Sequence, residues 1–322
     1  MIGRLKALAP PQIRAVARWA VERLPLPRKP AILMYHRIGR ETFDPWGLAV
    51  EQQLFEQQLQ WLAHNRSIVP LSELARRHRE GRLSNDLIAI TFDDGYAATL
   101  RAAVPLLEKF GVHATVFLPA GLIGRCRAYW WDELARIVVD FKGARLKFDG
   151  ESIVVPPPDE RDALWPSGAA PATPRQKLFQ SMRATLRPKP PEQIERIMEE
   201  LRRQARPAIR ADDRPLTVEE VGSIPAQIIG FGSHALTHAC LPALDDRAKI
   251  REVREGRRHC ASLTGREPIA FAYPFGEYDR SIMRIVEDAG FECAVTSDRG
   301  FVRRRSNIFA LPRLRIGNRL FG

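Results

Sequence analysis

The stretch LIAITFDDGY, residues 87–96, contains the pattern that decides the fold. Its first six residues are almost all apolar, as in the strands of a parallel sheet, which are buried on both faces. The run then ends abruptly at Asp93, Asp94 and Gly95. Neighbouring strand residues point to opposite faces, so we expect the two carboxylates to have different tasks. The alternative is a purely structural Asx turn, in which both acids only cap the next residues of the chain.

Apolar stretches of the same kind recur on both sides of this one and alternate with helical patterns. The strand-like stretches are residues 31–39, 113–121, 226–233, 268–273, 291–297 and 310–318, and the helical ones include residues 97–110, 249–263 and 281–290. This alternation is the βαβ rhythm, which predicts an α/β barrel of parallel strands with its site at their carboxyl ends.

The rhythm stops at about residue 125 and resumes after residue 215. This segment contains a hairpin-like stretch, a proline-rich tract and helical sequence, and it is too long to be a plain loop. We therefore divide the chain into an N-terminal segment, residues 1–30, and a barrel, residues 31–322, which is interrupted by a structured insertion over residues 125–215.

Composition limits the kind of partner. The net charge is +12, but the basic residues are scattered and do not alternate with aromatic residues, so we expect no nucleic-acid groove. The four cysteines include no CxxC pair and are expected to be reduced thiols. No run approaches the ~20 apolar residues of a membrane span.

The N-terminal segment has the pattern of a basic amphipathic helix over residues 13–24. We favour packing of this helix against the barrel; the alternative is peripheral contact with an anionic membrane. Because the segment lacks the continuous apolar run of a signal peptide, we expect a cytoplasmic protein that touches the inner membrane face at most through this helix.

Two histidines follow the strand-like stretch at residues 226–233. His234 and His238 are four residues apart, a spacing that on a helical turn directs both imidazoles to one side. Asp94, at the end of a neighbouring strand, would complete a two-histidine, one-carboxylate site for Zn²⁺ or another divalent ion. The histidine pair alone is weak evidence, but together with the DDG turn in the same chain it is much stronger.

With these motifs the sequence resembles the polysaccharide deacetylase family, carbohydrate esterase family 4. The resemblance lies in TFDDGY at residues 91–96, SHALTH at residues 233–238 and FAYPFGEYD at residues 271–279, and it extends over about residues 31–295. It implies a distorted (β/α) barrel that hydrolyses N-acetyl groups of amino sugars. By the same resemblance Asp93 is the general base, and Asp94, His234 and His238 bind one metal ion. Zn²⁺ is the expected ion, with Co²⁺, Ni²⁺ or Fe²⁺ as alternatives.

The chain also departs from the common family pattern. Its third motif has Ala272 where an Arg is frequent and Phe275 where a Tyr is frequent, and no later Leu-x-His motif is visible. The MYHRIG and FAYPFG forms are similar to the poly-N-acetylglucosamine deacetylase branch, in which a histidine after the first strand, here His36, serves instead. We expect Arg313 or Arg315 to replace the missing arginine.

The resemblance assigns the third motif to substrate and oxyanion contacts, through the backbone N–H of Phe275 and through Tyr273. The general acid is expected to be His36, because its ordinary pKa of about 6.5 suits proton donation and a nearby carboxylate favours the protonated form. His113 is the rival, but it precedes its strand and should lie at the opposite end of the barrel. The aromatic cluster at residues 129–131 either packs in a core, which we favour, or stacks on sugar rings.

The predicted function is therefore metal-dependent removal of N-acetyl or similar N-acyl groups from an N-acetylated glycan or its precursor. The alternative is a degenerate family member that binds glycan without turnover, against which the intact set of Asp93, Asp94, His234 and His238 argues.

Overall fold

The computed structural model describes residues 26–207 and 213–318. The amphipathic helix predicted at residues 13–24 lies outside the described residues. Within them, no helix is long and apolar enough to cross a membrane. All four cysteines are free thiols, and Cys126 alone among them is exposed.

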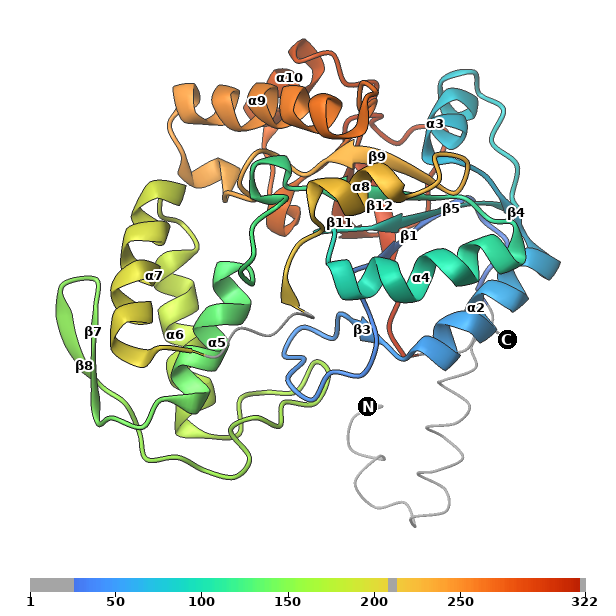
Figure 1. Cartoon of the computed structure of the whole chain (residues 1–322). Helices are drawn as coiled ribbons and strands as arrows, with labels where there is room; N and C mark the ends of the chain where they lie inside the picture. Colours follow the sequence, from blue (N-terminus) through green and yellow to red (C-terminus); the bar gives the residue numbers. More distant parts are fainter. Residues whose placement is uncertain (1–25, 208–212, 319–322) are drawn as a thin grey trace, which may run out of the picture.

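Seven parallel strands close into a barrel, as predicted (Figure 1). The ring is closed by β1 (Ala31–Tyr35), which pairs with strands on both of its sides. From β1 the order around the ring is β12 (Leu311–Arg315), β11 (Cys293–Arg299), β10 (Ala270–Ala272), β9 (Ile229–Ser233), β6 (Ala114–Leu118) and β5 (Leu87–Phe92). A short strand, β4 (Ser67–Ile68), adds to β5 outside the ring.

The register between β1 and β5 determines where the polar residues meet. Every residue of both strands is buried, as expected for continuous apolar strands of a closed parallel sheet. Tyr35 is opposite Phe92, and the two rings stack 5.4 Å apart. Because the last residues of the two strands are level, His36 and Asp93 leave the barrel side by side.

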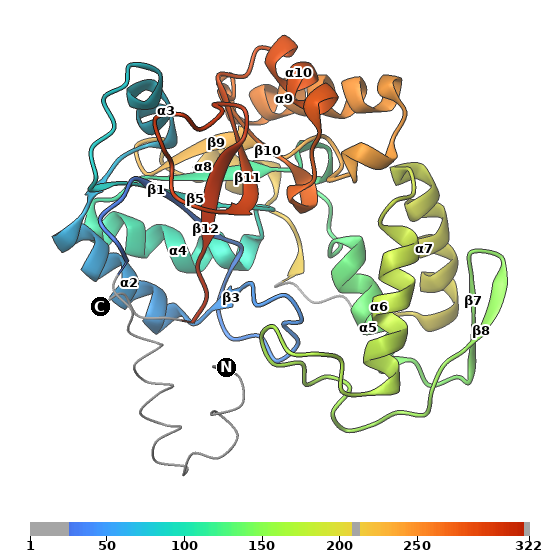
Figure 2. The same ribbon diagram turned by 180° about the vertical axis from the view of Figure 1, so that it is seen from behind.

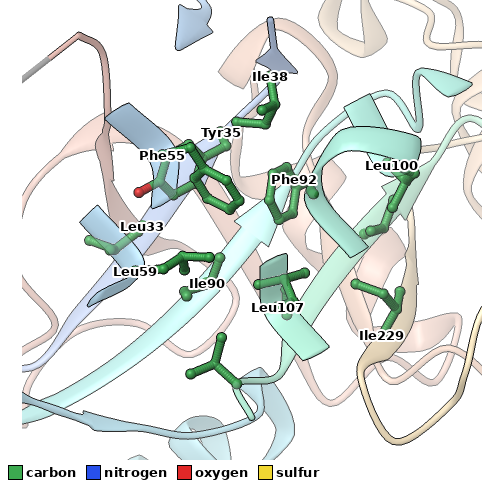
Figure 3. Close-up of a cluster of buried hydrophobic side chains, with 14 of the residues drawn as sticks. Leu33, Tyr35, Ile38, Phe55, Leu59, Ile90, Phe92, Leu100, Leu107 and Ile229 are labelled. Carbon is green, nitrogen blue, oxygen red and sulfur yellow. The ribbon is translucent and has the colours of Figure 1, made fainter. Parts of the chain in front are cut away.

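Helices cover the outside of the barrel. In Figures 1 and 2, α2 (Gln52–Asn65) and α4 (Ala97–Phe110) lie on one side, and α9 (Asp246–Thr264) and α10 (Arg280–Asp288) lie on the opposite side. The shorter helices are α3 (Leu71–Arg79) and α8 (Val218–Ser223). Figure 3 shows Phe55 of α2 packed on Tyr35 and Phe92 of the barrel, and Leu59 of α2 and Leu107 of α4 beside Ile90 of β5.

The insertion has an apolar core of its own. It contains α5 (Trp130–Asp140), a hairpin of β7 (Arg145–Phe148) and β8 (Glu151–Val154), α6 (Pro174–Leu186) and α7 (Pro191–Ala205). Leu134, Phe179 and Met198, one from each helix, are fully buried in this second core. Figure 2 shows the three helices beside the barrel, with the hairpin outermost.

Short elements connect these parts at the carboxyl end of the barrel. They are β2 (Arg37–Ile38), β3 (Ala49–Val50) and three 3₁₀ turns, η2 (Ala120–Leu122), η4 (Leu241–Ala243) and η5 (Pro274–Gly276). Arg37 joins the barrel to the insertion, because its guanidinium is 2.7 Å from Asp132 and 2.9 Å from Asp213. The insertion is therefore fixed against the edge where the strands end.

Candidate active site

The predicted site residues line a cleft of about 1150 Å³ at the carboxyl ends of the strands. His36 follows β1, the two aspartates follow β5, and His234 follows β9. Tyr273 and Phe275 reach the same cleft from the loop after β10. This is the position that a barrel of parallel strands predicts, since the loops after the strands form one common face.

Asp94, His234 and His238 form a buried cluster. One potential ligand atom of each lies within 4.8 Å of the others. The Asp94 Oδ1 atom is 3.3 Å from His238 Nε2 and 3.7 Å from His234 Nε2. The His234 Nδ1 atom is 2.7 Å from the carbonyl oxygen of Ala272, which fixes the ring and leaves Nε2 directed at Asp94.

The chemistry of this cluster fits a divalent cation. Within the described part of the chain, the buried Asp94 Oδ1 has no hydrogen-bond partner. Burial and the neighbouring Asp93 raise the pKa of the Asp94 carboxyl. Burial also lowers the pKa values of His234 and His238, so both imidazoles are neutral, which is the form that binds metal. A buried carboxyl oxygen without a hydrogen-bond partner beside two neutral imidazoles is a suitable ligand set for a cation, whose charge would favour the ionised form of Asp94.

The two histidines are not on a helix, and in this respect the sequence-based expectation was wrong. Residues 234–238 form a turn, and Ala235 and His238 have left-handed backbone conformations, with φ values of 62° and 58°. The turn is held by Glu252 of α9, whose buried carboxylate accepts hydrogen bonds from the backbone of Leu236 and Thr237 at 3.2 and 2.8 Å. Glu252 was not anticipated, because in the sequence it is one of several acids on a polar helix.

Asp93 faces a different partner from Asp94. Arg313 of β12 donates two hydrogen bonds of 2.7 Å to the Asp93 carboxylate, one to each oxygen. The arginine is itself completely buried, and its Nε donates to the carbonyl oxygen of Thr296 at 2.8 Å. Although burial opposes the charged form, the charge and the hydrogen bonds of Arg313 hold the pKa of Asp93 well below its usual range. Asp93 is therefore ionised at neutral pH.

The two candidate arginines have different positions. Arg315 lies at the rim of the cleft and donates to the backbone carbonyl of Trp46 at 2.9 Å. Within the described residues, Arg313 and not Arg315 forms the ion pair with Asp93. The two side chains lie on the same face of β12, because they are two residues apart. They differ in depth: Arg313 is buried inside the barrel, whereas Arg315, at the end of the strand, is exposed.

His36 lies beside the Asp93 carboxylate, with its Nε2 3.7 Å from Oδ2. The expectation that this carboxylate would keep His36 protonated is not met. Burial lowers the pKa of His36 to about 4, and Arg313 acts in the same direction, together outweighing Asp93. At neutral pH the imidazole is therefore neutral. His113 precedes β6 and lies against Gly230 at the start of β9, at the opposite end of the barrel, as expected.

The aromatic cluster before α5 packs in the interior and also forms one wall of the site. Tyr129 and Trp131 are buried and stacked, with ring centroids 4.7 Å apart, and the Tyr129 hydroxyl donates to the backbone carbonyl of Asp94. The Trp131 ring is also 4.7 Å from the ring of His238 and lines the cleft. Tyr129 therefore packs in the core, as we favoured, while Trp131 both packs in the core and lines the cleft.

The loop after β10 also lines the cleft, where the ring of Phe275 is 6.4 Å from that of Trp131. Phe275 has a left-handed backbone conformation with a φ value of 59°, and its ring is 4.5 Å from that of His238. The Tyr273 hydroxyl donates to the carbonyl oxygen of Phe309 at 2.8 Å, and its ring stacks on Tyr278. The hydroxyl of Tyr273 therefore donates its hydrogen bond to the main chain. This hydrogen bond does not support the expectation that Tyr273 contacts the substrate.

A known family model and several known proteins match parts of this chain. The sequence model of the polysaccharide deacetylases matches residues 80–140 and 211–294. The two matched parts leave out residues 141–210, most of the insertion. YxkH of Bacillus subtilis, which is assigned to the polysaccharide deacetylases, is 20% identical over 298 residues, 92% of this chain and 74% of its own length. The poly-beta-1,6-N-acetyl-D-glucosamine N-deacetylase of Staphylococcus aureus is 28% identical over 105 residues, which is 29% of this chain and 36% of that enzyme.

Two solved structures have the same fold. The deacetylase PplD of Streptococcus pyogenes superimposes with a TM-score of 0.57 at 18% identity, covering 90% of this chain and 93% of that one. IcaB from Ammonifex degensii gives a TM-score of 0.55 at 18% identity and covers 91% and 94% of the two chains. At this level of identity the likeness establishes the barrel architecture alone.

Proposed function

Because the chain contains a polysaccharide deacetylase domain, we propose that it is a metal-dependent hydrolase that removes N-acetyl or similar N-acyl groups from amino sugars of a polysaccharide or glycan precursor. The observation that carries the proposal is the pair of carboxylates at the end of β5. Asp93 is held ionised by Arg313, while Asp94 faces two neutral imidazoles in the same cleft. Metal-assisted hydrolysis of an amide uses a proton acceptor together with a cation that polarises the carbonyl group and activates water.

The ion would be held by Asp94, His234 and His238, with Zn²⁺ as the first candidate. Such an ion, when bound, supplies a Lewis acid for the acetamide carbonyl and lowers the pKa of water. The histidine rings are held in place by Trp131 and Phe275, which flank His238, and by the Ala272 carbonyl, which fixes His234. The protein thus presents its ligands in one fixed arrangement.

Asp93 would accept the proton of the attacking water. Its two hydrogen bonds to Arg313 orient the carboxylate and keep it ionised, so it is ready as a base at neutral pH. The C–N bond then breaks, acetate leaves, and the amine nitrogen must gain a proton. His36 is neutral and next to Asp93, so it can receive the proton that Asp93 has accepted and pass it to the amine.

The test is incubation of the protein with N-acetylglucosamine oligomers and with lipid-linked glycan precursors, with mass spectrometry of the products. We expect loss of acetyl groups from the sugar together with free acetate, and both should be abolished by a chelator and restored by added Zn²⁺. Binding of these glycans without release of acetate would instead identify a degenerate member that binds glycan without turnover.

A further inference from the structure

Four arginines surround the outer part of the cleft, and the reaction proposed above uses none of them. Arg183 lies in the last turn of α6 in the insertion, and Arg187 is the residue that caps the carboxyl end of this helix. Arg299 and Arg315 end strands β11 and β12 of the barrel. They thus approach the same cleft from separate parts of the chain.

Most of this charge has no carboxylate partner. Arg187 pairs with Glu277. Within residues 26–207 and 213–318, no carboxylate forms an ion pair with Arg183, Arg299 or Arg315. The carboxylates that line the cleft are Asp93, which pairs with Arg313, and Asp94, which belongs to the metal cluster. The outer cleft is therefore strongly positive.

Arg183 is the most constrained of the four. Its guanidinium lies over the rings of Trp46 and Phe275, 4.5 and 5.7 Å from their centroids, and its buried Nε has no hydrogen-bond partner within the described residues. Burial and the neighbouring Arg187 lower its pKa to about 10. Holding an unpaired guanidinium there costs free energy, which an anionic ligand would recover.

The oxygens of a neutral N-acetylated sugar can accept hydrogen bonds from these arginines but bring no charge to balance them, and a partly deacetylated polymer is cationic and would be repelled. We propose, on the basis of the deacetylase function above, that the substrate is an N-acetylated amino sugar bearing a phosphate group, which Arg183 binds together with Arg187 and Arg315. Several guanidinium groups on two walls suit a phosphate, which offers oxygens in several directions, whereas one bidentate arginine suffices for a carboxylate.

Binding can be measured without turnover. Asp93→Asn protein would be titrated calorimetrically with N-acetylglucosamine 1-phosphate and with the neutral methyl glycoside of N-acetylglucosamine. We expect the phosphate ester to bind roughly 10- to 100-fold more tightly, the usual effect of one charge-assisted hydrogen bond, and this preference to weaken with salt. Equal affinities for the two ligands would overturn the proposal.

Variants locate the binding residues. Arg183→Gln should remove most of the preference for the phosphate ester, and Arg315→Gln, at an exposed position, should reduce it. Arg203→Gln, an exposed arginine of α7 in the same insertion but outside the cleft, should leave it unchanged. If the preference survives both cleft substitutions, or if Arg203→Gln removes it equally, the assignment is wrong.

Measurement of acetate release distinguishes a failure of the phosphate-binding proposal from a failure of the deacetylase function on which it rests. Acetate released equally fast from the neutral and the phosphorylated sugar would refute the phosphate preference while the deacetylase stands. Selective binding of the phosphate ester, with no acetate from any substrate, would refute the deacetylase and leave the anion site. Uridine diphosphate N-acetylglucosamine serves as a third ligand, since tighter binding than the monoester indicates a sugar attached to a carrier through a diphosphate.

Discussion

Substituting Arg313 by glutamine should move the acid limb of the pH–rate profile to higher pH. The substitution removes both 2.7 Å hydrogen bonds to Asp93, a residue that is only 2% exposed in the wild type. Two unit charges about 4 Å apart at an effective dielectric constant of about 20 interact by about 4 kcal/mol, which corresponds to about 3 pKa units. Burial, the largest influence on Asp93, raises its pKa once the arginine is gone.

The direction of the shift follows from the role of the base. Asp93 must be ionised to accept a proton, so a raised pKa lowers kcat/KM most at acid pH and less toward neutral pH. The assay is kcat/KM for acetate release as a function of pH, with unfolding by urea as a check, because an unpaired buried carboxylate costs roughly 3–5 kcal/mol of stability. Arg203→Gln, at an exposed position outside the cleft, is the control, and its acid limb should stay where it is in the wild type. An acid limb that stays in place in Arg313→Gln, or moves to lower pH, would refute this reasoning.

Further predictions concern the metal, the acid and the membrane. Elemental analysis should find one divalent ion per chain in the wild type and much less in His238→Ala, and undiminished metal in that variant would remove His238 from the ligand set. His36→Ala should slow acetamide hydrolysis by roughly 10² to 10⁴ but affect an activated aryl acetate far less, because that leaving group needs no proton; equal losses would make His36 structural. Liposome flotation should show weak, salt-sensitive binding of the full chain to anionic vesicles, at roughly 1 kcal/mol per basic residue near the surface. A chain that starts at Pro30 should not bind, and identical behaviour of the two chains would exclude the membrane contact.

The parts of the fold that depend on local pattern could be predicted from the sequence. The apolar run before Asp93 was recognisable as a strand because a parallel sheet that is covered on both faces buries every residue of such a run. The same pattern predicted that His36 and Asp93 lie at the same end of the barrel, since each of them directly follows a strand. The insertion was recognisable because it breaks the alternation of strands and helices.

The features that depend on tertiary contacts could not be predicted in this way. The turn that brings His234 and His238 together is held by Glu252, which comes from a helix later in the chain. The choice between Arg313 and Arg315 depends on the depth of β12 in the barrel, which its pairing with β1 and β11 determines. The lowered pKa of His36 arises from burial, and its extent is a property of the packed cleft.

Acetate release by Asp93→Asn, compared with the wild type at equal metal content, tests the central claim most directly. The substitution keeps the shape of the side chain and the ligands Asp94, His234 and His238, but it removes the proton acceptor. We predict that the variant retains its metal and loses roughly 10² to 10⁴ in rate on N-acetylglucosamine oligomers. A variant that contains the same metal and releases acetate at close to the wild-type rate would contradict the account.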